Sequence, residues 1–250
     1  MYKNGGSFFS VIPPVTKNLI IINFIIWLAM MLFPAKIGDW VMHYCGLHYF
    51  EASDFNLAQV FTYMFVHSTD GIAHLFFNMF TLFMFGITLE RVLGAKRYLF
   101  FYLSCGIGAA IVQEIVWYFC WESIFVKPIA NLNGISLADA KEAIQQAVNM
   151  GRDLPFLNSL VTVGASGAIY GVLLAFGMIF PNRPLYLMFI PVPIKAKWMV
   201  IGYGLIELAL GLASARDGVA HFAHLGGMIF GFFILWYWKR NGTINRNGYY

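Results

Sequence analysis

Six stretches of the chain carry mostly apolar side chains and are separated by more polar segments. They cover about residues 18–33, 72–89, 98–119, 163–180, 198–213 and 219–238. A helix of about 20 apolar residues crosses the hydrocarbon core of a bilayer, so this pattern predicts six spanning helices. The first stretch is close to signal-peptide length, but no convincing small-x-small cleavage site follows it. We therefore predict that it is the first span.

Three of the connecting segments have patterns of their own. Residues 34–71 are rich in aromatic side chains but broken by charges, which is typical of a segment in the membrane interface. Residues 137–150 show the period of an amphipathic surface helix, and Ser136 and Asp139 have the spacing of a capping box. The prolines between 181 and 193 exclude a continuous helix and predict a turn and a hairpin.

The composition agrees with an all-α, polytopic membrane protein. Hydrophobic residues make up 60% and charged residues 11% of the 250 positions, and the mean hydropathy is +0.68, more than a water-soluble domain needs. The net charge of +4 is too modest to indicate a nucleic-acid partner. The three cysteines match no metal or redox motif, and we expect no cofactor and no metal.

The basic residues predict an orientation. Lys and Arg gather before the first stretch, between the second and third, between the fourth and fifth, and after the sixth. These places lie on one side of a six-span bundle, so the positive-inside rule predicts cytoplasmic termini, in the plasma (inner) membrane. We expect one domain over residues 18–238, with an extracytoplasmic insertion at about 120–160 and cytoplasmic tails at 1–17 and 239–250.

Four polar side chains fall in or near the first turns of three spans. His74 and Asn78 begin the second stretch, Ser166 begins the fourth, and His224 begins the sixth. Because these three helices enter from the same side, the four side chains are expected to lie at similar depth. Polar groups inside a membrane are costly unless they are paired or functional, so a purely structural network of hydrogen bonds stays open at this point.

The residue types favour acyl-transfer chemistry. A serine hydroxyl becomes a nucleophile when an adjacent histidine takes its proton, so Ser166 and His224 are predicted to form a catalytic dyad. His74 and Asn78 are one helical turn apart and can donate hydrogen bonds to a developing oxyanion, together with the backbone N–H of Ser166. No acid is expected as a third member, because Asp217 lies in a short solvated loop.

Three motifs of this chain resemble those of the rhomboid intramembrane serine proteases. They are Gly164-Ala165-Ser166-Gly167, the His74 and Asn78 pair with the following Glu90, and the run from Ala223 to Gly231. The resemblance extends over all six predicted helices in order. It implies an endopeptidase with Ser166 as nucleophile and His224 as general base. Its expected substrates are single-pass or polytopic membrane proteins in the lipid bilayer, cleaved in or near a transmembrane segment.

The resemblance also implies supporting roles. Tyr170 is expected to pack against the catalytic imidazole. Gly227 and Gly231 are expected to bring the sixth helix close to Gly167 on the fourth, as small residues at four-residue spacing do in membranes. The fifth span and the connection at 213–218 form the candidate gate for substrate. One departure from the family pattern is that the Trp-Arg pair of some relatives is absent from the aromatic first loop.

The remaining histidines allow other interpretations. His221 is the rival for the general base, but His224 is favoured because it lies deeper and within the glycine-rich motif. We assign His221 to the rim of the cavity, and His67 to a capping role at the start of the second span. A metal site is not favoured, because no H-E-x-x-H motif is present.

Two carboxylates fall inside predicted spans. Glu114 lies near the outer end of the third and is expected to reach the interface, whereas Glu207 is near mid-span and must be paired or protonated. Helix-packing hydrogen bonds are favoured for Glu207. The alternatives are a transporter using Glu207 and His74, which lacks paired inverted halves, and a non-catalytic protein of the same fold. The presence of both Ser166 and His224 argues against the latter.

Overall fold

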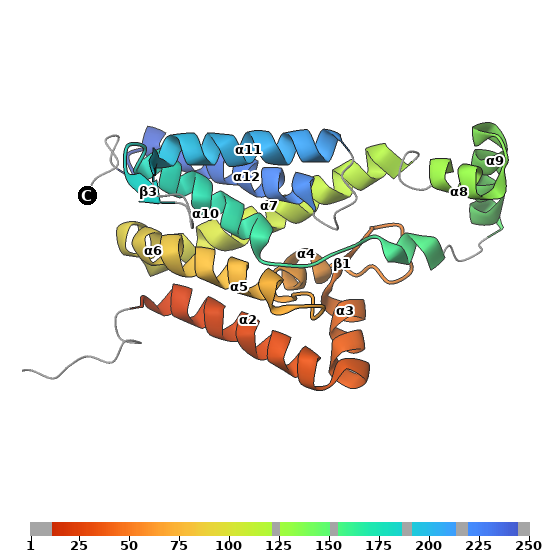
Figure 1. Ribbon diagram of the computed structural model, residues 1–250, viewed down its shortest axis with the longest axis horizontal. Helices are drawn as coiled ribbons and strands as arrows, with labels where there is room; N and C mark the ends of the chain where they lie inside the picture. Colours follow the sequence, from red (N-terminus) through yellow and green to blue (C-terminus); the bar gives the residue numbers. More distant parts are fainter. Residues whose placement is uncertain (1–11, 122–125, 151–154, 187–191, 214–219, 245–250) are drawn as a thin grey trace, which may run out of the picture.

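The computed structural model describes residues 12–121, 126–150, 155–186, 192–213 and 220–244. It is an all-α membrane bundle whose long helices lie side by side in Figure 1. The six apolar segments of the described chain are α2 (Pro14–Leu32), α5 to α6 (Ile72–Thr81 and Ile87–Leu93, joined by the π turn η3, Leu82–Gly86), α7 (Ala95–Trp121), α10 (Ser166–Ile179), α11 (Ala196–Leu212) and α12 (His221–Arg240).

Three of these segments are long and apolar enough to cross a membrane by themselves, namely Pro14–Leu32, Ile72–Leu93 and Ala95–Cys120. Helix α10 is shorter, with 14 residues, and most of its side chains are buried. At 1.5 Å per residue it extends about 21 Å, against about 30 Å of hydrocarbon. In Figure 1 it begins part-way along its neighbours, so its first residue lies inside the bundle and not at its end.

Helices α10 and α12 approach each other through glycines. A Cβ on Gly227 would overlap the backbone carbonyl of Gly167, and a Cβ on Gly231 would lie 3.3 Å from the Cα of Gly171. Such backbone contact gives the helices their van der Waals attraction in a membrane, where apolar side chains gain nothing by leaving lipid. The crossing therefore fixes the position of the first turn of α12 relative to that of α10.

The segment after α2 folds back over the end of the bundle at which α2 ends. It contains η1 (Pro34–Gly38), α3 (Asp39–Cys45), β1 (Leu47–His48), α4 (Gln59–Thr62) and η2 (Tyr63–Phe65). The Gln59 side chain donates to the carbonyls of His43 and Asp54 and accepts from the N–H of His48. Trp40 and Leu57 remain exposed, as expected for a segment in the membrane interface.

This segment is tied to the start of α10. Strand β1 pairs antiparallel with β2 (Val161–Thr162), which comes just before Gly164 in the chain. The N–H of Gly164 also donates to the carbonyl of Tyr63, at 3.0 Å. From the third span, the Glu114 carboxylate accepts the N–H of Phe50. Glu114 therefore contacts the folded-back segment, and its expected position in the membrane interface stays a prediction.

The two predicted local elements are confirmed. Helix α9 (Leu137–Asn149) begins with the cap that the Ser136 and Asp139 spacing predicted, because Asp139 N donates to Ser136 Oγ at 3.1 Å and Ser136 Oγ donates to the Asp139 carboxylate at 2.8 Å. It packs on α8 (Lys127–Asn133) away from the bundle, at the right of Figure 1, and η5 (Pro155–Ser159) follows. The proline-rich segment forms a hairpin, in which β3 (Pro184–Tyr186) pairs with β4 (Pro193–Lys195).

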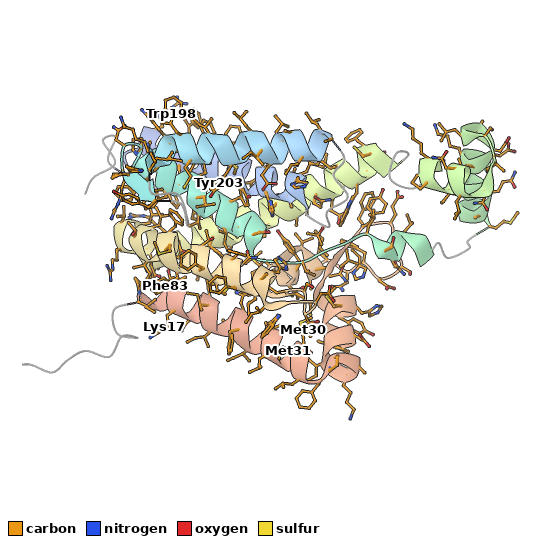
Figure 2. All side chains as sticks on the ribbon, in the orientation of Figure 1. Lys17, Met30, Met31, Phe83, Trp198 and Tyr203 are labelled. Atoms are coloured by element: carbon orange, nitrogen blue, oxygen red, sulfur yellow. The ribbon has the colours of Figure 1, made fainter. Side chains whose placement is uncertain are left out.

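Helix α2 begins at Pro14, four residues before the predicted start. Proline is tolerated at the first helical position because its missing N–H has no partner there. The next two N–H groups, of Val15 and Thr16, donate to the carboxylate of Glu90 at 2.8 and 2.7 Å. Figure 2 shows Lys17 and Trp198, from the starts of α2 and α11, at the same end of the bundle.

Candidate active site

Ser166 and His224 lie in contact although 58 residues separate them. The distance between Ser166 Oγ and His224 Nε2 is 2.7 Å, which is a hydrogen bond between the first turns of α10 and α12. His224 is 7% exposed. No side chain caps the start of α10, so N–H groups of its first turn and the positive end of its dipole face this contact.

Gly164 shapes the approach to the serine. Its φ of +124° belongs to a region that other residues rarely adopt, and a Cβ there would lie 2.8 Å from His74 Nε2 and 3.7 Å from Ser166 Oγ. His74 Nε2, Gly164 and Ser166 Oγ therefore surround one small space. Any side chain at position 164 would fill it.

His67 supports the same turn from outside the spans. Its Nε2 accepts the N–H of Ala165 at 3.4 Å, and its side chain is fully buried. Burial lowers the pKa of His67 to about 3, with a further contribution from nearby His74, so the ring stays neutral and able to accept. The predicted capping role is wrong, because Gly71 precedes α5 and no side chain caps that helix.

His74 and Asn78 lie on one face of α5, as expected. The N–H of Ser68 donates to His74 Nδ1 at 3.4 Å, which leaves the ring proton on Nε2, the nitrogen next to Gly164. Asn78 Nδ2 donates to the backbone carbonyl of His74 at 2.8 Å. One of its two amide hydrogens is therefore used within the helix, and the other is available to a ligand.

Tyr170 covers the imidazole of His224. The two rings are stacked, with their centroids 4.2 Å apart and their planes 8° apart. The hydroxyl of Tyr170 also forms a hydrogen bond with the Glu207 carboxylate. The stacking fixes the tilt of the imidazole, and the hydroxyl brings a residue of α11 into the same cluster.

Glu207 differs from what the sequence indicated. Its Oε2 lies 3.1 Å from His224 Nδ1 and 2.6 Å from His221 Nδ1. The expectation that no acid stands beside the histidine is therefore wrong, as is the assignment of His221 to a cavity rim, since His221 is buried and hydrogen bonded. Glu207 is paired, as its mid-span position required. Asp217 lies outside the described residues.

The sequence held one signal for this contact, namely a single carboxylate in the middle of an apolar span. It gave no signal for the partner, because which face of α11 meets α12 is decided by packing and not by residue spacing. The same holds for His221, three residues before His224. That spacing is compatible with a shared helix face, but it does not say which side chains the face will meet.

Glu207, His221 and His224 also form a group of possible metal donors, whose ligand atoms lie within 4.8 Å of one another. Two nitrogen or oxygen ligands of one tetrahedral zinc, each about 2.0–2.1 Å from the metal, are about 3.3 Å apart. The 2.6 Å between His221 and Glu207 is shorter than that and is the distance of a hydrogen bond. The arrangement therefore fits a proton-sharing cluster better than a metal centre.

Fold and site together define an all-α, polytopic integral membrane protein with a buried serine–histidine contact between two of its helices. The chain matches the Rhomboid domain over residues 54–120 and 129–241. It belongs to the rhomboid family.

Its relatives include RHOMBOID-like protein 4 of Arabidopsis thaliana, which is 31% identical over 71% of this chain and 34% of the relative. Rhomboid protein 1, mitochondrial, of Saccharomyces cerevisiae is 27% identical over 66% of this chain and 37% of the relative. Rhomboid protease GluP of Bacillus subtilis is 27% identical over 65% and 23%. The chain thus spans between about a quarter and two fifths of the curated relatives it matches.

Proposed function

We propose that this protein is an intramembrane serine endopeptidase in which Ser166 is the nucleophile and His224 the general base. The observation that carries the proposal is the 2.7 Å contact between Ser166 Oγ and His224 Nε2, made inside an apolar bundle. Membership of a family that includes a named rhomboid protease supports it. A hydroxyl and an imidazole in such contact are the minimum needed for acyl transfer.

The steps follow from this contact. Ser166 Oγ attacks the scissile carbonyl carbon while its proton passes to His224 Nε2, and the carbonyl electron pair moves onto oxygen. When the tetrahedral intermediate collapses, the C–N bond breaks and Nε2 returns the proton to the leaving amine. Water then hydrolyses the ester in the same two steps and frees Ser166. Water must therefore reach the serine from the extracytoplasmic side.

The oxyanion is stabilised by three donors. These are the backbone N–H of Ser166 at the start of α10, the Nε2–H of His74, and the remaining amide hydrogen of Asn78. Each such donor is worth about 3 kcal/mol in a transition state because it is oriented before the charge develops. Gly164 keeps the space between His74 and Ser166 open for the reacting carbonyl.

The supporting roles follow from packing. Tyr170 holds the plane of the His224 ring, and Gly167, Gly227 and Gly231 hold α12 against α10 so that the two reacting side chains stay in reach. A shift of about 1 Å between them is enough to lower turnover about 100-fold.

The substrate is a single-pass or polytopic membrane protein, cleaved in or next to a transmembrane segment that unwinds readily. Because α10 is short, the scissile bond must come below the outer membrane surface, and substrate reaches it laterally past α11. We place both termini in the cytoplasm and the protein in the plasma (inner) membrane, with one protease domain over residues 18–238. The rest of the candidate gate, residues 214–218, and Asp217 lie outside the described residues.

Labelling with a serine-directed fluorophosphonate in detergent tests the nucleophile. The wild-type protein should be labelled and Ser166→Ala should not. Cleavage of a reporter transmembrane substrate tests the base: His224→Ala should lose activity, whereas His221→Ala should retain a measurable part of it. Labelling that persists in Ser166→Ala, or cleavage by His224→Ala at the wild-type rate, would overturn the proposal.

A further inference from the structure

Glu207 is the single buried side chain in the outer half of α11. From residue 201 to residue 213 every other described side chain is exposed or half-exposed, whereas Glu207 is 6% exposed. Leu205 and Ile206 beside it are exposed by more than half. A carboxylate facing inward from a lipid-exposed helix is costly unless its partners hold it there.

Those partners belong to the candidate active site. One carboxylate oxygen meets the hydroxyl of Tyr170 on α10, and the other meets Nδ1 of both His221 and His224 on α12. His224 in turn holds Ser166 Oγ through its Nε2. Three helices therefore contribute to one continuous chain of contacts that runs from the carboxylate through the imidazole to the serine hydroxyl.

The order of these contacts has a chemical consequence. His224 can accept the serine proton on Nε2 only if its other proton is on Nδ1, and a carboxylate beside Nδ1 favours that tautomer. After proton transfer the imidazole is cationic, and the same carboxylate stabilises it. The proton stays on Nδ1 throughout, so the carboxylate need not be protonated at any step.

We propose that Glu207 is a positioning residue of this site, which orients His224 through Nδ1 and stabilises its imidazolium. The inference rests on the proposed peptidase function and adds a third member to its serine–histidine pair. At 3.1 Å the Glu207 oxygen lies close to Nδ1 but outside standard hydrogen-bond geometry. The same oxygen is hydrogen bonded to His221 Nδ1, and the other carboxylate oxygen contacts the hydroxyl of Tyr170, so these two side chains hold the carboxylate beside the His224 ring.

Orientation of His224 and simple helix packing predict different kinetic effects when Glu207 is replaced. If Glu207 only tied α11 to the bundle, its bonds to Tyr170 and His221 would suffice. Its removal would then loosen substrate binding and stability. If it orients His224, its removal must slow the chemical step while substrate binding is kept.

The test is steady-state cleavage of a reporter transmembrane substrate by the full-length protein in liposomes, comparing wild type, Glu207→Gln and Glu207→Asp. We expect Glu207→Gln to lower kcat about 100-fold or more with little change in KM. Glu207→Asp keeps the charge on a shorter side chain and should recover a large part of kcat. Ile25→Ala, a truncation at an exposed position of α2 and outside the candidate gate, should leave both constants unchanged.

Several outcomes would overturn the inference alone, provided that wild type is active and Ser166→Ala is not. One is wild-type kcat in Glu207→Gln. Another is a raised KM with kcat kept, or a loss in which Glu207→Asp is no better than Glu207→Gln. A third is loss of wild-type cleavage on adding a chelator and its return with zinc, which would make Glu207 a metal ligand. If the wild-type protein neither cleaves nor is labelled, the proposed function itself fails.

Should Glu207→Gln not fold, Glu207→Asp still decides the question by the KM-against-kcat split. The fluorophosphonate labelling rate gives a second readout that needs no substrate helix. It should fall in parallel with kcat in Glu207→Gln and stay at the wild-type level in Ile25→Ala. An unchanged labelling rate in a folded Glu207→Gln would contradict the orienting role.

Discussion

Glu90 and Glu207 are both buried, but Glu90 lies on α6, at the end of the bundle where α2 begins (Figure 1), whereas Glu207 lies in the second half of α11, and the two meet different kinds of partner. Glu90 accepts two backbone N–H groups and the hydroxyl of Thr16, all from the first turn of α2. Glu207 meets only side chains, and one of them holds the serine. Backbone donors fix a helix, whereas titratable side-chain donors can take part in proton transfer.

For a carboxylate buried in a membrane bundle, a structural role can be distinguished from a role in proton transfer by its hydrogen-bond partners. Burial and pairing are common to both residues and decide nothing by themselves. The partners decide, because Glu90 completes a helix N-terminus in the way a capping side chain does. Glu207 ends a chain of contacts that leads to Ser166, the proposed nucleophile.

The largest effect is expected from a substitution that separates His224 from Ser166 and leaves the contacts of Glu90 intact. In Gly227→Ala the new methyl group would overlap the carbonyl of Gly167, so α12 must move away from α10 and carry His224 away from Ser166. We expect reporter cleavage to fall at least about 100-fold. The matched control is Gly202→Ala on α11, where a Cβ meets nothing within 4 Å. Equal activity in the two variants would contradict the packing role of Gly227.

Replacing Glu90 should give the converse result, a loss of stability without a loss of chemistry. Glu90→Gln removes the charge that receives the N–H groups of Val15 and Thr16, which is worth about 1.5–3 kcal/mol for a charged acceptor. Unfolding in detergent should shift by that amount while kcat at a permissive temperature stays at the wild-type level. Glu142→Gln, at an exposed position on α9, is the control. A large fall in kcat in Glu90→Gln would contradict a purely structural role for Glu90.

The stability of the protein should also depend on pH, because His67, which supports the turn before Ser166, is buried and has a lowered pKa. His67 stays neutral when folded down to about pH 3 but binds a proton near pH 6.5 when unfolded, so the unfolded state is favoured as pH falls between these values. Stability is full above pH 6.5 and declines below it, by at most about 1.4 kcal/mol per pH unit from this residue.

Unfolding titrations between pH 7.5 and 5 check this sign, with His67→Gln as the non-titrating variant. The variant should be less stable at pH 7.5, since it changes the acceptor for the Ala165 N–H, but its stability should depend less on pH. A slope as steep as that of the wild type would show that His67 does not carry the dependence.

A smaller effect is expected from trimming the contact between Tyr170 and Glu207. Tyr170→Phe keeps the ring stacked on His224 and removes only the hydroxyl that meets the carboxylate. We expect kcat to fall less than about tenfold, equivalent to one hydrogen bond of about 1 kcal/mol. Tyr203→Phe, whose ring centroid lies 6.5 Å from that of Tyr170, should have no effect. A greater loss in Tyr170→Phe than in Glu207→Gln would reverse the proposed order of importance.

Most of the fold could be predicted, because a helix that crosses a membrane needs about 20 consecutive, mostly apolar residues. Apolar stretches of the right length marked all six helices, and prolines and a Ser–Asp pair marked the hairpin and α9. The start of α2 was missed by four residues, because the groups that stabilise it come from Glu90, 74 residues away from Thr16. Local sequence does not contain that information.

The site could be predicted where a motif and a topology agreed, and not where packing alone decided. Basic residues in alternate loops predicted that three of the helices run parallel, and therefore that His74, Ser166 and His224 lie at similar depth. The structure brings these side chains to the same space. Glu207 was identified as mid-span but assigned to helix packing, because α11 is apolar on all sides and shows no preferred face.

The lone inward carboxylate of α11 has a consequence for how turnover is timed. The outer half of this helix has no other buried side chain to keep it in place. If α11 moves outward to admit a substrate helix, Glu207 moves away from His224 and the imidazole loses its counter-charge. If substrate enters past α11 as proposed, His224 would lack this carboxylate while α11 is displaced and regain it when the helix returns, so that cleavage would be confined to the closed arrangement.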